Sequence, residues 1–270
     1  MKREKIKQLS VTALCCGFGI LTSCSTDTKK VQESIPSTKD SIVVNDEVGR
    51  IALTVEHPAD TTSALSLTIT EYLSETLGGT FSGSYSSPNE VMAYYHADTY
   101  KNMKEEYDNI KNIREGDWKL LWNATLSKQA ETDKYITYSY QCENYLGGAH
   151  GMHILAGITI RKSDCRRMGW EILRNWQNEK MQNLMRQGLK AYFNVKTDEE
   201  LKPMLFKEEY IYSLPLPQCP PLFTHEGIEF VYNSYEIAPY AAGKPTFTIP
   251  YAELKDFMTV TAKQLANCCK

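Results

Sequence analysis

The sequence predicts an α+β fold: an antiparallel sheet with flanking helices, in a single compact domain that has room for two subdomains. Apolar residues alternate with polar ones in consecutive segments between residues 118 and 160, as in strands with one buried face. Segments with apolar residues at helical spacing lie before and after this run. Strands that follow one another without intervening helices pair antiparallel, whereas a parallel sheet needs helices between its strands.

A strand or hairpin and two helices are predicted before this run. Alternation over residues 42–56 predicts the strand or hairpin. Helical spacing over residues 61–77 predicts the first helix, which ends at Gly78 and Gly79. Residues 87–90, Ser-Pro-Asn-Glu, have the pattern of a capping box with proline at the first helical position, so a second helix is expected to begin there.

The alternating run itself predicts three strands and is followed by a third long helix. The strands are centred on residues 120–124, 136–140 and 154–160. Helical spacing then returns over residues 172–192.

The C-terminal part combines an irregular connection with short strands and a helix. Four prolines between residues 215 and 221 mark the connection. Alternation over residues 228–232 and the apolar segment 247–250 predict strands. Apolar residues at helical spacing over residues 251–265 predict a C-terminal helix.

The N-terminus has the pattern of a lipoprotein signal peptide. Basic residues among the first seven precede a mostly apolar segment, residues 9–21, which is shorter than the roughly 20 residues of a membrane-spanning helix. Residues 21–24, Leu-Thr-Ser-Cys, resemble the lipobox of bacterial lipoproteins, in which signal peptidase cuts before the cysteine and the thiol receives a diacylglyceryl group. We therefore expect lipidation of Cys24; the alternative is an ordinary cleaved signal peptide with an incidental cysteine.

These features divide the chain into three parts. Residues 1–23 are the predicted signal peptide, residues 24–40 a lipidated flexible tether, and residues 41–270 the α+β domain. Lipid on Cys24 would attach the chain to a membrane. Ser25 after it is compatible with the outer membrane, with the domain in the periplasm or at the cell surface.

Composition and motifs argue against several functions. The net charge of −3 gives no basic surface for nucleic acid. The sequence contains no nucleophilic serine, P-loop or dinucleotide-binding signature. No Cys-x-x-Cys spacing occurs, which disfavours a zinc ribbon or a thioredoxin-type redox site. Adjacent carboxylates such as Glu105 and Glu106 indicate solvated helix faces rather than an acid–base pair. We predict no cofactor and no metal.

A glycine-rich loop, Tyr-Leu-Gly-Gly-Ala-His-Gly at residues 145–151, joins two of the predicted strands. Gly147 and Gly148 permit positive φ, and at least one is expected to adopt it. His150 and His153 are conceivable metal ligands, but residues three apart on an extended chain point to opposite faces and no acidic third ligand stands nearby. A hydrogen bond of His150 within a turn is the favoured interpretation.

Tyrosine is abundant, with 17 residues in 270, and several fall between residues 232 and 251. Tyrosine offers amphipathic contact area for recognition of proteins or carbohydrates. The alternative is that these rings fill the interface between a sheet and its helices. Tyr235 and Tyr240 lie in a segment without strand or helix periodicity, which makes them candidates for contact.

Two segments far apart in the sequence together resemble a known family. The pairing of Y-x-G-G-A-H-G at residues 145–151 with P-Y-A-A-G at residues 239–243 is similar to the extracytoplasmic domain shared by RsiV anti-sigma factors and PdaC-type peptidoglycan deacetylases. Trp118 and the Ile-Pro-Tyr of residues 249–251 also fit. The resemblance extends over roughly residues 42–265.

The resemblance implies an α+β domain and, through RsiV, the binding of lysozyme as a signal of cell-wall attack. The sequence shows no sigma-binding segment, no transmembrane helix and no additional deacetylase domain. We therefore expect neither direct sigma-factor control nor PdaC-like catalysis. A cysteine, Cys165, also lies near a turn position where relatives usually have glycine.

The leading hypothesis is a non-enzymatic, lipid-anchored binding domain of the bacterial envelope, with a ligand such as lysozyme or a peptidoglycan fragment. The alternative is an envelope hydrolase or carbohydrate-processing enzyme with an unrecognised site. The predicted binding residues come from the two loops and are Tyr145, Gly147, Gly148, His150, Tyr235 and Tyr240. The competing structural interpretation is that the two loops pack against each other as a corner of the fold.

Overall fold

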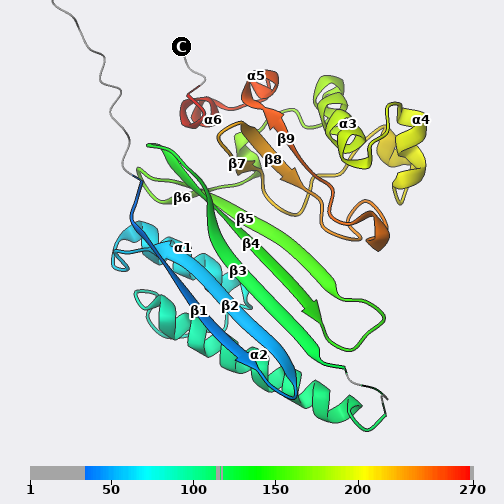
Figure 1. Cartoon of the computed structure of the whole chain (residues 1–270). Helices are drawn as coiled ribbons and strands as arrows, with labels where there is room; N and C mark the ends of the chain where they lie inside the picture. The colour runs from blue at the N-terminus through cyan, green and yellow to red at the C-terminus, as the bar shows by residue number, and fades with distance from the viewer. Residues whose placement is uncertain (1–33, 114–115, 117, 268–270) are drawn as a thin grey trace, which may run out of the picture. The chain divides into compact units, whose positions relative to one another are not determined.

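The computed structural model describes residues 34–113, 116 and 118–267. It confirms the predicted α+β fold: these residues form two sheets with helices beside them (Figure 1). The larger sheet has the strand order β1-β2-β3-β4-β5-β6 and the smaller one the order β7-β8-β9. The strands of the larger sheet are β1 Ser37–Asn45, β2 Gly49–Pro58, β3 Leu120–Glu131, β4 Tyr135–Tyr145, β5 Met152–Arg161 and β6 Arg166–Met168. The smaller sheet contains β7 Leu222–Phe223, β8 Gly227–Val231 and β9 Thr246–Pro250.

The helices fall before and after the long strands. They are α1 Ala64–Thr76, α2 Pro88–Ile110, α3 Glu179–Phe193, α4 Asp198–Leu201, α5 Tyr251–Leu254 and α6 Val260–Leu265. Short 3-10 turns occur at η1 Trp170–Ile172, η2 Lys202–Met204, η3 Glu208–Ile211 and η4 Tyr240–Ala242.

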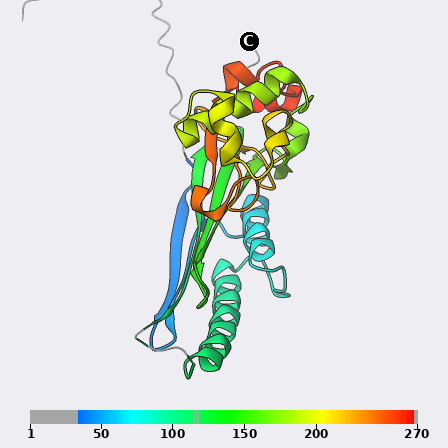
Figure 2. The same ribbon diagram turned by 90° about the vertical axis from the view of Figure 1, so that its right-hand side faces the viewer.

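The larger sheet is mixed rather than purely antiparallel. All its neighbouring strands pair antiparallel except β2 and β3, which run parallel with Gly49 opposite Leu120. The reason is the connection: α1 and α2 lie between these two strands in the chain and carry it back along one face of the sheet (Figures 1 and 2). A crossover of this length permits a parallel pair, which a short turn does not.

The face of the larger sheet that α1 and α2 cover is the first core. Ile51, Leu53 and Leu126 from the strands are fully buried there, together with Leu73 of α1 and Met92 of α2. Their alternation along the strands and helical spacing on the helices explain why the sequence predicted these elements correctly.

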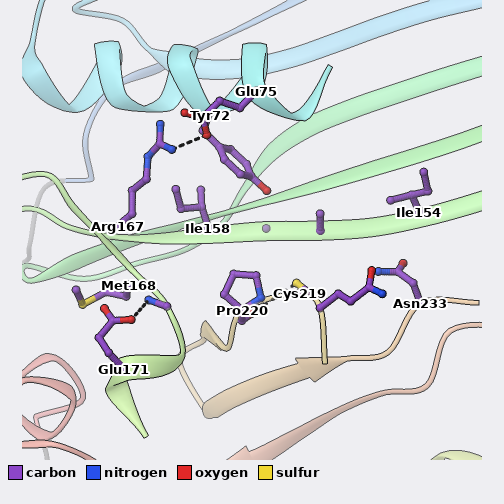
Figure 3. Close-up of a pocket in the computed structure, with 14 residues that line it drawn as sticks. Tyr72, Glu75, Ile154, Ile158, Arg167, Met168, Glu171, Cys219, Pro220 and Asn233 are labelled. Atoms are coloured by element: carbon purple, nitrogen blue, oxygen red, sulfur yellow. Dashed lines mark hydrogen bonds and ion pairs between the residues drawn. The ribbon is translucent and has the colours of Figure 1, made fainter. Parts of the chain in front are cut away.

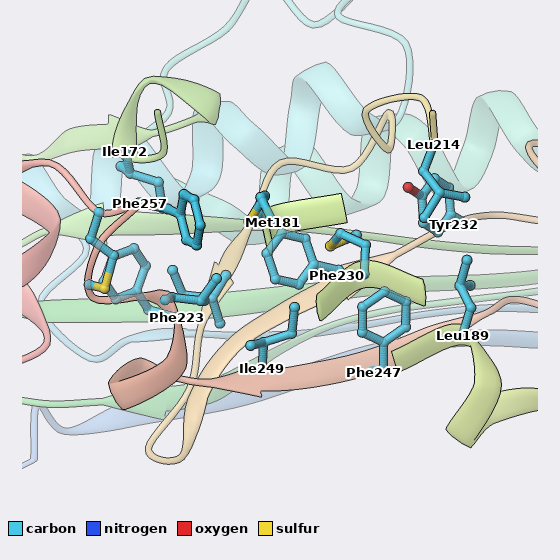
Figure 4. Close-up of a cluster of buried hydrophobic side chains, with 14 of the residues drawn as sticks. Ile172, Met181, Leu189, Leu214, Phe223, Phe230, Tyr232, Phe247, Ile249 and Phe257 are labelled. Carbon is cyan, nitrogen blue, oxygen red and sulfur yellow. The ribbon is translucent and has the colours of Figure 1, made fainter. Parts of the chain in front are cut away.

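The second core lies between α3 and the smaller sheet. Met181 and Leu189 of α3 face Phe230 of β8 and Phe247 of β9, and all four side chains are buried (Figure 4). The smaller sheet contacts β4 and β5 through β7. Gly157 of β5 is required at this contact, because a Cβ there would lie 2.7 Å from the side chain of Leu222.

Three details of the sequence-based prediction are wrong. The second helix begins at Pro88 as expected, but Ser87 makes no capping hydrogen bond from its side chain, so the capping box does not form. The third helix begins at Glu179 rather than residue 172, capped by Asn178. The C-terminal helix is broken into α5 and α6, because Met258 pairs with Leu173 in a β-bridge between them.

Other expectations concern the ends of the chain and one turn. The predicted signal peptide, Cys24 and the tether up to residue 33 lie outside the described residues; Ser37 already belongs to β1, so the folded part begins before residue 41. No described helix has the length and apolar character needed to cross a membrane. Cys165 adopts φ 57°, so this turn keeps the left-handed conformation that favours glycine.

Candidate binding site

The loop between β4 and β5 is shaped by one of its two adjacent glycines. Gly147 has φ 85°, which confirms that at least one of the pair adopts positive φ. Gly148 does not lie in that region, and a Cβ there would meet only the carbonyl oxygen of His150 at 3.8 Å. Only Gly147 is therefore required by backbone conformation.

His150 links this loop to the one that follows β8. Its Nδ1 lies 2.9 Å from the carbonyl oxygen of Gly151. A carbonyl only accepts, so Nδ1 carries the proton and Nε2 accepts a hydrogen bond from the hydroxyl of Tyr235 at 3.0 Å. The imidazole also stacks on the ring of Tyr240, with centroids 3.9 Å apart and planes 21° apart.

One further ring, that of Phe206, completes what we call the aromatic cluster: Phe206, His150, Tyr235 and Tyr240. Tyr235 is 52% exposed and adopts φ 70°. The ring of Phe206, 48% exposed, lies parallel to it at 6.4 Å, with planes 7° apart. The ring centroids of Tyr240 and Tyr235 lie 5.7 Å apart. The cluster thus presents fixed aromatic groups to solvent.

Asn233 anchors the second loop to the edge of β5. Its Nδ2 donates to the carbonyl of Leu155 at 2.9 Å, and its Oδ1 accepts from the amide of Leu155 at 2.8 Å. The side chain therefore pairs with β5 as a neighbouring strand would. Glu236 holds the same loop by accepting from the amides of Asn233 and Gln218. Burial raises the pKa of Glu236 against the effect of these two hydrogen bonds.

The structure brings together three of the six predicted site residues: His150, Tyr235 and Tyr240. Gly147 and Gly148 lie in the connecting loop, and Tyr145 ends β4 opposite Leu121. The competing interpretation of a corner is also confirmed in part, because the two loops do contact each other.

Sequence reasoning missed Phe206, Asn233 and Glu236. Phe206 comes from a third segment, joined to the loop by a hydrogen bond from its amide to the carbonyl of Ile237 at 2.8 Å. Asn233 and Glu236 carried a usable signal, since polar side chains that bind nearby backbone groups are typical of tight loops.

Metal ligation is not supported by the geometry. Among residues 34–113, 116 and 118–267, no three His, Cys, Asp or Glu side chains gather as a potential ion site. Both ring nitrogens of His150 have hydrogen-bond partners. His153 lies on β5 with its Nε2 3.9 Å from Glu143.

A groove of about 540 Å³ runs along the outer edge of β5, between α1 and the segment that contains Cys219 (Figure 3). Asn233 lines it too, so the groove adjoins the loop that carries the aromatic cluster. Burial raises the pKa of the Cys219 thiol to about 12. That thiol therefore stays protonated at neutral pH and is a poor nucleophile.

Comparison with known proteins identifies the fold. A structure of a DUF3298 family member from Bacteroides fragilis NCTC 9343 has a TM-score of 0.61 and 21% identity, covering 85% of this chain and 96% of that one. A DUF3298 family protein from Pseudomonas aeruginosa PAO1 has a TM-score of 0.56 and 15% identity, covering 85% of this chain and 97% of that one. No curated protein matches the sequence. Residues 220–252, which carry Asn233, Tyr235 and Tyr240, match the model of the family described as "Protein of unknown function (DUF3298)", whose solved members share the fold of this chain.

Proposed function

We propose that this chain is a lipid-anchored binding domain of the bacterial cell envelope and that the aromatic cluster is its contact surface. The ligand is a protein such as lysozyme or a peptidoglycan fragment. The observation that carries the proposal is that loops more than 80 residues apart hold half-exposed rings in one place through directed hydrogen bonds. Rigid aromatic groups at the surface are typical centres of binding energy.

The position of the cluster supports this role. Ser34, the first described residue, hydrogen-bonds Glu131 beside the start of β4. The cluster lies past the other end of β4, whose eleven residues span roughly 34 Å. The cluster thus lies at the end of the larger sheet that is remote from Ser34, where the described part of the chain begins.

The lipobox and the resemblance to RsiV and PdaC supply the cellular setting: export, a lipid anchor in the outer membrane, and a ligand connected with the cell wall. In this proposal the chain binds its ligand and does not catalyse a reaction on it. The side chains of the cluster are aromatic rings, and its single imidazole is hydrogen-bonded to a phenol and a backbone carbonyl rather than to a serine or cysteine nucleophile.

Binding experiments with single variants test the contact role. Full-length chain in detergent is mixed with lysozyme and, separately, with purified sacculi. His150→Ala, Tyr235→Ala and Tyr240→Ala are expected to weaken binding by more than about 1 kcal/mol without a change in melting temperature. Tyr212→Ala is the control, because Tyr212 is 74% exposed and outside the cluster.

Two results would contradict the proposal. A lower melting temperature with unchanged affinity in these variants would mean that the cluster stabilises the fold and does not contact the ligand. Release of labelled products from peptidoglycan by the wild-type chain would favour the alternative of an envelope hydrolase or carbohydrate-processing enzyme.

The anchor has its own test. Cys24→Ala is expected to leave a folded protein that no longer sediments with membranes, because the lipid is the proposed attachment. A variant that remains in the membrane pellet after salt and carbonate washes would refute the anchor.

A further inference from the structure

The groove beside β5 continues from the aromatic cluster along one strand. The cluster begins at His150, before β5, and the groove follows β5 from Ile154 to Ile158. Asn233 belongs to both, since it lines the groove while its loop carries Tyr235. The strand residues from Met152 to Ile158 span roughly 20 Å, and His150 lies two residues before this stretch. A linear ligand can therefore occupy both sites at once.

The middle of the groove is lined mostly by apolar side chains. Ile154 and Ile158 of β5 form one wall, Tyr72 of α1 faces them, and Pro220 lies on the opposite side (Figure 3). The amide side chains of Gln218 and Asn233 are the polar groups at the end nearest the cluster. Such a lining suits small apolar side chains on a backbone that needs a few hydrogen bonds.

The far end of the groove carries a surplus of negative charge. Arg167 donates to Glu75 at 2.6 Å and to Glu71 at 3.0 Å, and Arg166 lies 3.7 Å from Glu171. Of these groups, Glu75, Glu171 and Arg167 line the groove, so two carboxylates there stand against one guanidinium group. The side chains of Glu75 and Glu171 are 51% and 48% exposed, whereas that of Arg167 is 32% exposed. A ligand's ammonium group is therefore favoured here over an anion.

We propose that the groove binds the stem peptide of a peptidoglycan fragment, with a free side-chain amino group beside Glu75 and Glu171 and the sugar at the aromatic cluster. The inference rests on the proposed function and specifies its ligand. Size favours a short peptide over a protein segment: 540 Å³ is the volume of a small-ligand pocket, whereas protein partners bury about 800 Å² each. Four extended residues span about 14 Å, which is close to the roughly 13 Å of β5 between Ile154 and Ile158, the strand residues that line the groove.

The probe is a tetrapeptide of stem-peptide sequence, acetylated at its N-terminus, with a diamino acid at the third position. Binding to the full-length chain in detergent is measured by calorimetry. A second peptide carries an acetyl group on the side-chain amine as well. We expect the free-amine peptide to bind at least fivefold more tightly, and Glu75→Gln or Glu171→Gln to remove that preference. Glu143→Gln is the matched control, because Glu143 is half-exposed on β4 and does not line the groove.

The outcomes separate this inference from the proposed function. Equal binding of the two peptides, an unchanged preference in both groove variants, or no peptide binding would overturn the inference. A second outcome is that His150 and Tyr240 are needed for binding of sacculi or lysozyme, while the peptide has no effect on that binding. This result would overturn the groove assignment and leave the proposed function intact. Loss of the amine preference in Glu75→Gln with an unchanged melting temperature would support it, since a folding defect would weaken both peptides equally.

Discussion

The two ends of β4 and β5 are held in different ways. At one end Glu131 is 8% exposed and accepts hydrogen bonds from Lys128, Lys162, the Ser34 hydroxyl and the Ile35 amide. At the other end the aromatic cluster joins three segments through one imidazole–phenol hydrogen bond and stacked rings that remain half-exposed.

Under the proposed function, the Glu131 end stabilises the fold and the cluster end binds the ligand. Buried charges that satisfy one another are costly to break, because removal of one leaves the others uncompensated. Exposed rings contribute less to folding, yet they keep surface that a ligand can cover. We therefore expect substitutions at the Glu131 end to change the free energy of unfolding, and those at the cluster to change affinity.

The largest effect is expected for Glu131→Ala. The change leaves Lys128 and Lys162 without their carboxylate and frees the segment that begins at Ser34, so the free energy of unfolding should fall by about 3–5 kcal/mol. Urea unfolding measures it. Glu143→Ala, a half-exposed carboxylate at the other end of β4, is the control and should cost less than about 1 kcal/mol. Equal losses of unfolding free energy in the two variants would contradict the proposed difference between the two ends of β4.

Low pH should reduce the stability that the Glu131 end contributes to the fold. Burial alone would raise the pKa of Glu131, but the hydrogen bonds from Lys162, Ser34, Ile35 and Lys128 outweigh it and lower the pKa from 4.5 to about 2. A lowered carboxyl pKa means that its stabilisation is present above about pH 4.5 and is lost as the pH falls towards 2. This group contributes at most about 3 kcal/mol to that loss. Glu131→Gln should flatten the pH dependence of unfolding over this window; an unchanged slope would show that other carboxyls cause it.

Substitution of the adjacent glycines, at the cluster end, is expected to change stability by an intermediate amount. Gly147→Val should destabilise the protein by roughly 1–3 kcal/mol, because valine is strained at φ 85°. Gly148→Val should cost less than about 0.5 kcal/mol, since its backbone is not in the left-handed region. Thermal melting of the two variants compares them directly. A larger loss at Gly148 would contradict the loop conformation.

The smallest change in stability is expected for Tyr235→Phe. It removes the hydroxyl that donates to His150 and keeps the ring that stacks on Phe206. Because both partners are exposed, the free energy of unfolding should change by less than about 0.5 kcal/mol. Ligand affinity should fall more than stability does, since the imidazole loses its orientation. A melting loss of several degrees would place the hydroxyl among the stabilising contacts of the fold.

Much of the fold could be predicted from periodicity. Ile51, Leu53 and Leu126 alternate on strands that bury one face, and Leu73 and Met92 lie on helical stripes, so local pattern and burial agree. Where tertiary contacts compete with local pattern, prediction failed: Leu173, at the start of the pattern that predicted the third helix, pairs with Met258 in a β-bridge, and the helix begins only at Glu179. The same bridge separates α5 from α6. The site was found in part, because glycines and tyrosines outside regular periodicity mark loops, but periodicity cannot show which loops meet.

The sequence by itself determined the order and type of most elements, the position of the two loops and the left-handed turn at the adjacent glycines, because these depend on interactions between near neighbours in the chain. Tertiary structure alone decided that β2 and β3 are parallel, that Phe206 joins the rings of the cluster, and that Asn233 pairs with Leu155. Each of these contacts joins residues far apart in the chain, and its formation depends on packing that no local pattern encodes.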